Sequence, residues 1–87
     1  MTMTDLQVTV RFFAAARAAA GIETETLRLP SGTTVDGLVS ELTSRSPELA
    51  KVLLRCSFLH DGIAVRDRTR RLETNQTVDV LPPFAGG

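Results

Sequence analysis

The last two residues of the chain are glycines, which makes the terminal carboxylate the first candidate for chemistry. Gly86 and Gly87 close the sequence, directly after Ala85. A glycine carboxylate has no side chain beside it, and glycine backbone adopts conformations that other residues avoid. The α-carboxyl group has a reference pKa of about 3.3–3.7, so it is ionised at neutral pH. We expect Gly87 to carry a free carboxylate that can be activated as an acyl group, with Gly86 and Ala85 forming a narrow approach to it.

Two prolines precede this end and are expected to hold it away from the domain. Pro82 and Pro83 follow a strand-like run over residues 77–81. Each proline has a fixed φ and no backbone donor for sheet pairing, which favours an extended chain. The alternative is a disordered glycine-rich end of the kind that many domains have. Strand, prolines and chain end together favour a stiff spacer, so we expect one domain over residues 1–81 and an extended tail over residues 82–87.

Composition narrows the classes of function. The 87 residues carry no formal net charge, which argues against a general nucleic-acid binder and against a basic membrane-binding patch. No apolar run is long enough to span a bilayer, and no secretory signal is recognisable. Cys56 is the only cysteine, so an internal disulfide is excluded. We expect a small cytoplasmic protein.

Periodicity predicts the elements of the first half of the chain. Alternating apolar and polar residues predict strands over residues 6–12 and 24–29. The alanine-rich run 14–20 between them favours a short helix, which Gly21 would end. We expect Thr33, three residues before an aspartate, to cap the main helix. Its buried face has the helical spacing of Val35, Leu38, Val39 and Leu42.

The second half of the chain completes an α+β pattern. Pro47 ends the main helix and, with Ser46 as its cap, begins a short second one. The pair Asp61-Gly62 between two strand-like runs is the strongest short signal for a β-hairpin. Residues 77–81 form the last strand. This order predicts a mixed sheet of about five strands with one main helix packed across it.

Two large apolar residues fall on the polar faces of the terminal strands. Phe13 shares the face of Arg11 on the first strand, and Leu81 shares the face of Asp79 on the last. If these strands are neighbours, Arg11 can meet Asp79 and Phe13 can lie near Leu81. Such an exposed apolar patch, with Phe84 beyond it, would mark an interaction surface. The alternative is a local twist or bulge that turns Phe13 inward.

The other polar candidates favour structural roles. Cys56 lies between an apolar helical stripe and a strand, which favours a buried, inert thiol. His60 borders the Asp-Gly turn without a second ligand at metal spacing, so we expect an exposed turn residue. Residues 66–71 are rich in arginine and read as a solvated loop, with steering of an acidic partner as the alternative. No phosphate loop, catalytic triad or metal-ligand set is recognisable, so we expect no catalytic machinery and no bound cofactor or metal.

Both ends of the chain resemble the MoaD/ThiS family of β-grasp, ubiquitin-like sulfur carriers, and most of all its molybdopterin synthase branch. The start is similar in its apolar strand over residues 10–14, followed by Arg17 and Gly21. The end, LPPFAGG over residues 81–87, is similar to the family terminus P-P-V-[AS]-G-G, with Phe84 in place of the usual valine. The resemblance covers nearly the whole chain and implies the β-grasp fold.

The resemblance also implies a role for the tail. In such carriers an ATP-dependent activating enzyme similar to ubiquitin E1 adenylates the terminal glycine, and a sulfur donor protein supplies the sulfur of a C-terminal thiocarboxylate. The thiocarboxylate then enters the large subunit of molybdopterin synthase and gives its sulfur to the pterin precursor of the molybdenum cofactor. On this view Gly87 is the only reacting residue, and ATP is used by the activating enzyme.

A partner-binding surface follows from the same resemblance. It would consist of apolar residues around the tail: Phe13, Ile63, Leu81, Pro82, Pro83 and Phe84. Ala18 departs from the acidic residue that the family usually has there. Three other functions stay open: a sulfur carrier for thiazole or cysteine biosynthesis, a ubiquitin-like modifier linked to lysines of targets, and a β-grasp binding domain with an inert tail.

Overall fold

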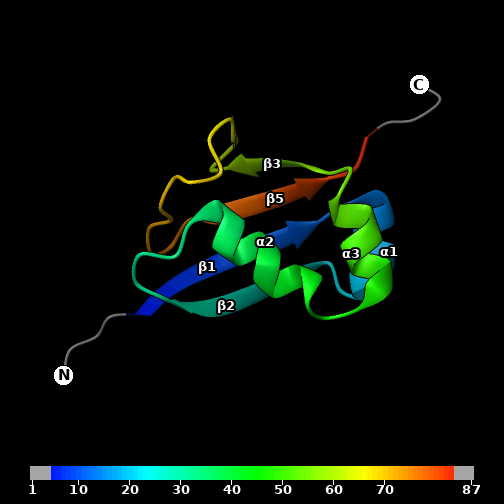
Figure 1. Ribbon diagram of the computed structural model, residues 1–87, viewed down its shortest axis with the longest axis horizontal. Coiled ribbons are helices and arrows are strands. Elements are labelled where there is room, and N and C mark those ends of the chain that lie inside the picture. The colour runs from blue at the N-terminus through cyan, green and yellow to red at the C-terminus, as the bar shows by residue number, and fades with distance from the viewer. Residues whose placement is uncertain (1–4, 84–87) are drawn as a thin grey trace.

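Five strands and three helices make up the computed structural model, which describes residues 5–83 (Figure 1). In chain order the elements are β1 (Asp5–Phe12), α1 (Ala14–Ala20), β2 (Thr24–Pro30), α2 (Val35–Thr43), α3 (Pro47–Leu53), β3 (Ser57–His60), β4 (Ile63–Ala64) and β5 (Thr77–Leu81). The predicted elements are all found. Where the end of a strand differs from its prediction, it differs by one residue.

The last strand lies in the middle of the sheet. The strand order is β2-β1-β5-β3-β4, and β5 is parallel to β1 and antiparallel to β3. The helices lie on one face, with α2 across the sheet and α1 beside α3 at one end (Figure 1). This arrangement confirms the predicted mixed α+β fold of the β-grasp type, in which the tail follows the central strand.

Apolar side chains of the alternating strand positions meet the helices in one core. The strands contribute Val8, Val10 and Phe12 of β1 together with Val78 and Val80 of β5. The helices contribute their predicted apolar stripes, which include Leu38, Leu42, Leu49 and Leu53. These side chains are at most 2% exposed. Because β5 has neighbours on both edges and core on one face, the point at which the tail begins is firmly held.

The cap of α2 is Thr34, so the prediction of Thr33 was wrong by one residue. The hydroxyl oxygen of Thr34 accepts a hydrogen bond from the Gly37 amide at 3.1 Å. The Thr33 hydroxyl instead donates to the carbonyl of Pro30 at 2.6 Å and closes the preceding turn. Thr33 and Thr34 have the same side chain, so the sequence alone does not distinguish them as caps. The residue at which the helical backbone begins decides which of the two caps the helix.

We expect Thr34→Ala to lower the free energy of unfolding by about 1 kcal/mol, because the Gly37 amide loses its acceptor. Thr34→Ser keeps the hydroxyl and is the matched control, with a loss expected to be well under half of that. Urea denaturation followed by circular dichroism measures both. Equal losses in the two variants would contradict the assignment of Thr34 as the cap.

The hairpin after β3 has the expected turn, but the residue before the turn is buried. Asp61 and Gly62 both have positive φ, 48° and 83°, as a two-residue type I′ turn requires. His60, however, is only 5% exposed, so the prediction of an exposed turn residue was wrong. The ring lies opposite Val78 of the central strand, and its Nδ1 is 3.4 Å from Nε2 of Gln76. Pairing with β5 turns this strand position toward the core.

The arginine-rich connector is solvated in its side chains and ordered in its backbone. The carbonyls of Arg68 and Arg70 accept hydrogen bonds from the amides of Asp36 and Val35, at 2.9 and 3.0 Å. The Arg68 guanidinium lies 4.8 Å from the centre of the Phe58 ring. These bonds satisfy amides at the start of α2 that have no partner within the helix. The connector therefore helps to hold the main helix in place.

Candidate functional site

The root of the tail comprises Leu81, Pro82 and Pro83. Leu81 ends the central strand, Pro82 is buried and Pro83 is exposed. Because proline has no amide donor, the ladder with the neighbouring strands stops here and the chain leaves the sheet. The remaining predicted site residues, Phe84, Ala85, Gly86 and Gly87, lie outside the described residues.

Phe13 lies next to this root on the outer side of the sheet. The parallel strands β1 and β5 end at the same edge, and the Phe13 amide donates to the carbonyl of Val80 at 3.2 Å. The backbone of Phe13 is still extended, so its side chain is opposite to the buried Phe12. It is 38% exposed and is not turned inward. The structure thus places Phe13 and Leu81 on one face, as their positions in the sequence predict.

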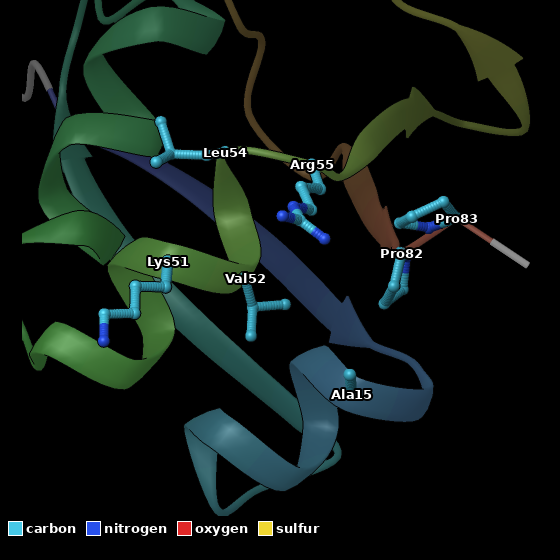
Figure 2. Close-up of a pocket in the computed structure, with 7 residues that line it drawn as sticks. All are labelled: Ala15, Lys51, Val52, Leu54, Arg55, Pro82 and Pro83. Carbon is cyan, nitrogen blue, oxygen red and sulfur yellow. The ribbon is translucent and has the colours of Figure 1, made fainter. Parts of the chain in front are cut away.

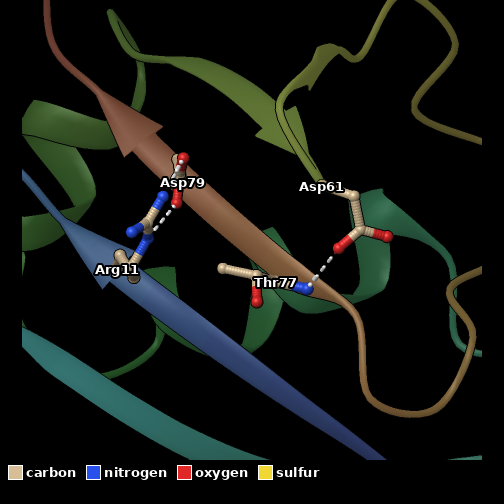
Figure 3. A network of polar contacts seen from close by, with 4 residues as sticks. All are labelled: Arg11, Asp61, Thr77 and Asp79. Atoms are coloured by element: carbon tan, nitrogen blue, oxygen red, sulfur yellow. Dashed lines mark hydrogen bonds and ion pairs between the residues drawn. The ribbon is translucent and has the colours of Figure 1, made fainter.

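An ion pair fixes the two strands beneath this patch (Figure 3). Arg11 donates two hydrogen bonds to Asp79, from Nε to Oδ1 at 2.6 Å and from Nη2 to Oδ2 at 2.8 Å. The hydrogen bond with the carboxylate raises the pKa of Arg11, and the Coulomb attraction adds to it. The guanidinium also lies 5.7 Å from the centre of the Phe13 ring. The predicted pairing of Arg11 with Asp79 is confirmed, and it sets Phe13 in place.

The structure does not bring Ile63 to this patch. Ile63 is 63% exposed, but it pairs with His60, and directly opposed residues share a face of the sheet. It therefore belongs to the helix-side face at the edge strand. Leu59 takes the place on the outer face, because it pairs with Asp79 and is half-buried. Its alternation with Phe58 and His60 was the signal in the sequence that could have found it.

The match to a known family decides what this site belongs to. Residues 10–87 match the ThiS family, which includes the whole of the tail. The chain belongs to the ThiS family. The resemblance of its two ends to the MoaD/ThiS carriers is thereby confirmed, and the chain is a sulfur carrier of that type.

Relatives of this ThiS-family chain carry names of two kinds. The molybdopterin synthase sulfur carrier subunit of Chlamydomonas reinhardtii is 29% identical over 83 residues, which cover 94% of this chain and all of that one. A putative molybdopterin converting factor subunit 1 from Pyrococcus furiosus is 25% identical, with a TM-score of 0.82 over 91% of this chain and 99% of that one. The small archaeal modifier protein 1 of Methanosarcina acetivorans is also 25% identical, with a TM-score of 0.79 over 95% and 98% of the two chains.

Cys56 of this ThiS-family chain is half-buried at the end of α3, less enclosed than predicted. Its Sγ donates to the carbonyl of Val52 at 3.2 Å. Burial raises the pKa of the thiol, because a thiolate is poorly solvated there. The thiolate is the reactive form of cysteine, so this environment disfavours reaction.

We expect Cys56 to react with a disulfide reagent more slowly in the folded protein than in urea. The raised pKa means that the thiolate appears at higher pH in the folded chain, so the ratio of the unfolded rate to the folded rate is largest below the pKa of the unfolded thiol and falls as pH rises through the two pKa values. The disulfide reagent releases a coloured thiol when it reacts with Cys56, and the absorbance of that thiol measures the rate in both states. Equal rates in the folded and unfolded chain would contradict the structural role of Cys56.

The described residues lack two further kinds of feature. Between residues 5 and 83, no group of three or more His, Cys, Asp or Glu side chains is placed to hold a metal ion. Within the same range, none of the helices has the length and apolar character needed to cross a membrane.

Proposed function

We propose that the chain is the sulfur carrier subunit of molybdopterin synthase and that Gly87 carries the sulfur as a thiocarboxylate. The observation that carries this proposal is the family match, which runs to the last glycine rather than stopping with the globular domain. This chain matches the Chlamydomonas reinhardtii relative over that protein's full length. The name of that relative supports the choice of the molybdopterin branch.

The chemistry explains why a separate activating enzyme is needed. A carboxylate is a poor acyl donor, so the Gly87 carboxylate attacks the α-phosphorus of ATP and pyrophosphate leaves. The resulting acyl adenylate has AMP as a good leaving group. Sulfur that a donor protein supplies at the sulfide level, as hydrosulfide, then attacks the glycine carbonyl carbon, the bond to AMP breaks, and the products are the thiocarboxylate, AMP and a proton. We expect these steps in the cytoplasm, with the ATP bound by the activating enzyme and no cofactor held by this chain.

The described residues position the tail and present a docking surface. The central strand and Pro82 fix the starting point, and the four residues after Pro83 can span at most about 14 Å. A partner whose active site takes Gly87 must therefore approach the root closely. Phe13 and Leu81 offer apolar contact there, together with Pro83. That partner is the large subunit of molybdopterin synthase after sulfur loading.

Intact-mass spectrometry tests the proposal. The chain co-expressed with its activating enzyme and sulfur donor should gain the mass difference between one sulfur and one oxygen, located on Gly87 by fragmentation. An unmodified terminus under these conditions would overturn the proposal and favour a β-grasp binding domain whose tail is inert. Copurification with a thiazole synthase or a sulfhydrylase, without the large subunit, would move the carrier to thiazole or cysteine biosynthesis.

A second candidate is a ubiquitin-like protein modifier, which the similarity to a small archaeal modifier protein favours. Gly87 would then form amide bonds with lysines of other proteins. Lys51 is the only lysine of this chain, so a polymer linked through its own lysines would have a single branch point. Bands of high mass that survive denaturing electrophoresis with thiols and disappear with Gly87 removed would support the modifier.

A further inference from the structure

Within residues 5–83 the sheet has one long edge that pairs with no further strand. β2 is the outermost strand beside β1 and pairs with it from Thr24 to Pro30, whereas β4 at the opposite edge has two residues. Figure 1 shows α2 in front of the sheet rather than beyond β2. An exposed edge of this length offers a row of backbone donors and acceptors to another strand. β2 is therefore the element that is best placed to extend the sheet.

The hydrogen-bond pattern shows which residues of β2 direct their backbone outward. The Phe12 amide donates to the carbonyl of Glu23 at 2.8 Å, so these two residues form a hydrogen-bonded pair. Such pairs recur at alternate residues of an antiparallel ladder, so the odd-numbered residues of β2 bond to β1. The amides and carbonyls of Thr24, Thr26 and Arg28 therefore point away from the sheet. Within residues 5–83 no hydrogen bond reaches them.

β2 lacks most of the features by which natural edge strands avoid pairing. Those features are a short length, a lysine or an inward-pointing charge, and a proline or a bulge within the strand. The register with β1 runs without a bulge, and Pro30 stands only at the end. Arg28 is the only charged side chain of β2 on the outer face, and Glu25 on the other face is paired with Arg45. The chain carries no formal net charge, so two copies do not repel each other at long range.

We propose that β2 pairs with β2 of a second copy of this chain, antiparallel about a two-fold axis at Thr26. A surface on such an axis is its own partner, so Thr26 opposes Thr26 of the second copy. Thr24 then opposes Arg28 of the second copy, and Arg28 opposes its Thr24. All the outward amides of these three residues find a carbonyl of the other copy. The two sheets become one continuous sheet.

Neighbouring registers are less favourable than the one centred on Thr26. A shift of the axis to Glu25 places two glutamates opposite each other, and like charges at opposed positions destabilise a sheet. A shift of the axis to Leu27 places Thr24 opposite Pro30. Proline has no amide to donate, and the carbonyl of Pro30 already accepts hydrogen bonds within its own turn. The axis at Thr26 avoids both conflicts.

This pairing involves the edge of the sheet and not the strand that carries the tail. β1 lies between β2 and β5, from which the tail starts. One strand from each copy makes a smaller interface than a standard complex, which buries about 800 Å² on each partner. We therefore expect a dimer that dissociates on dilution.

Sedimentation equilibrium of the full chain tests this inference. Between about 10 μM and about 1 mM the average mass should rise toward that of two chains. Thr26→Pro should weaken dimerisation about tenfold or more, because it removes an outward donor and no hydrogen bond to β1. Thr26→Ser keeps the backbone amide and is the matched control, expected within about twofold of the wild type. Thermal unfolding checks that both variants are folded.

Disulfide trapping tests the register and does not depend on the proline variant. In chains that carry Cys56→Ser, Thr26→Cys should link to its counterpart under mild oxidation, because the Cα atoms of a hydrogen-bonded pair are about 5.5 Å apart. Thr24→Cys would lie about 13 Å from its counterpart and should link at least about tenfold more slowly. A mixture of Thr24→Cys and Arg28→Cys should link at a rate comparable to that of Thr26→Cys.

The outcomes separate this inference from the proposed function, which the mass gain on Gly87 tests without any dimer. A single-chain mass at about 1 mM would overturn the inference and leave the carrier role intact. Dimerisation that Thr26→Pro retains, or equal trapping at the three positions, would overturn it as well. A monomeric wild type whose Thr26→Pro variant binds the large subunit or the activating enzyme more weakly would show that the edge accepts a strand of that partner, which also contradicts the inference.

Discussion

Removal of Gly87 will lower sulfur transfer by at least about a hundredfold and leave the domain folded. Deleting one residue draws the carboxylate back by about 3.3–3.6 Å. A displacement of about 1 Å from the reactive geometry can already cost a hundredfold in rate. The globular core is complete at residue 81, so thermal unfolding should not change.

Two variants of the same residue separate length from bulk. Gly87→Ala keeps the position of the carboxylate and adds one methyl group, which tests whether the partners' tunnels require a glycine. An additional glycine after Gly87 keeps the tip narrow but moves the carboxylate outward. We expect all three variants to be defective in forming the thiocarboxylate, measured by intact mass over time. A deletion variant loaded at the wild-type rate would contradict the role of Gly87.

Neighbouring phenylalanines should give opposite phenotypes. Phe12 is 1% exposed in the core, so Phe12→Ala should cost about 3–5 kcal/mol of the free energy of unfolding. A domain of this size is stable by only about 5–15 kcal/mol, and the variant should unfold at a much lower temperature. Phe13→Ala should cost less than about 1 kcal/mol, because Phe13 is 38% exposed.

Binding of the large subunit should depend on Phe13, although the stability of the domain depends mainly on Phe12. Phe13→Ala removes an aromatic contact beside the tail root, and we expect about tenfold weaker binding of the large subunit. Phe13→Tyr is the matched control, since it keeps the ring and adds a hydroxyl at an exposed position. Calorimetry of binding and urea denaturation measure the two effects. Loss of stability in Phe13→Ala without loss of binding would contradict the assignment of Phe13 to the docking surface.

Local patterns in the sequence were enough for most of the elements. Alternation over β1 separated the buried Phe12 from the exposed Phe13, because successive strand residues face opposite sides. The Asp61-Gly62 pair predicted the hairpin, since this turn type needs positive φ at both positions. Prolines 82 and 83 marked the end of the last strand. Each signal acts over a few residues and needs no knowledge of distant parts of the chain.

Pairing between distant segments accounts for what the sequence missed. His60 is buried because β3 lies beside β5, and the same register places Ile63 on the helix side and Leu59 beside Asp79. The pocket between Ala15, Val52 and Pro82 likewise forms only where α1, α3 and the segment after β5 come together (Figure 2).

The sequence by itself therefore determined the elements, the faces of the long strands and the chemistry of a glycine tail. Only the tertiary structure decided which strands are neighbours and which edge residues are buried. The reason is that strand pairing depends on burying apolar surface from distant segments together, as with Val10 of β1 beside Val78 of β5, and no local pattern specifies the partner.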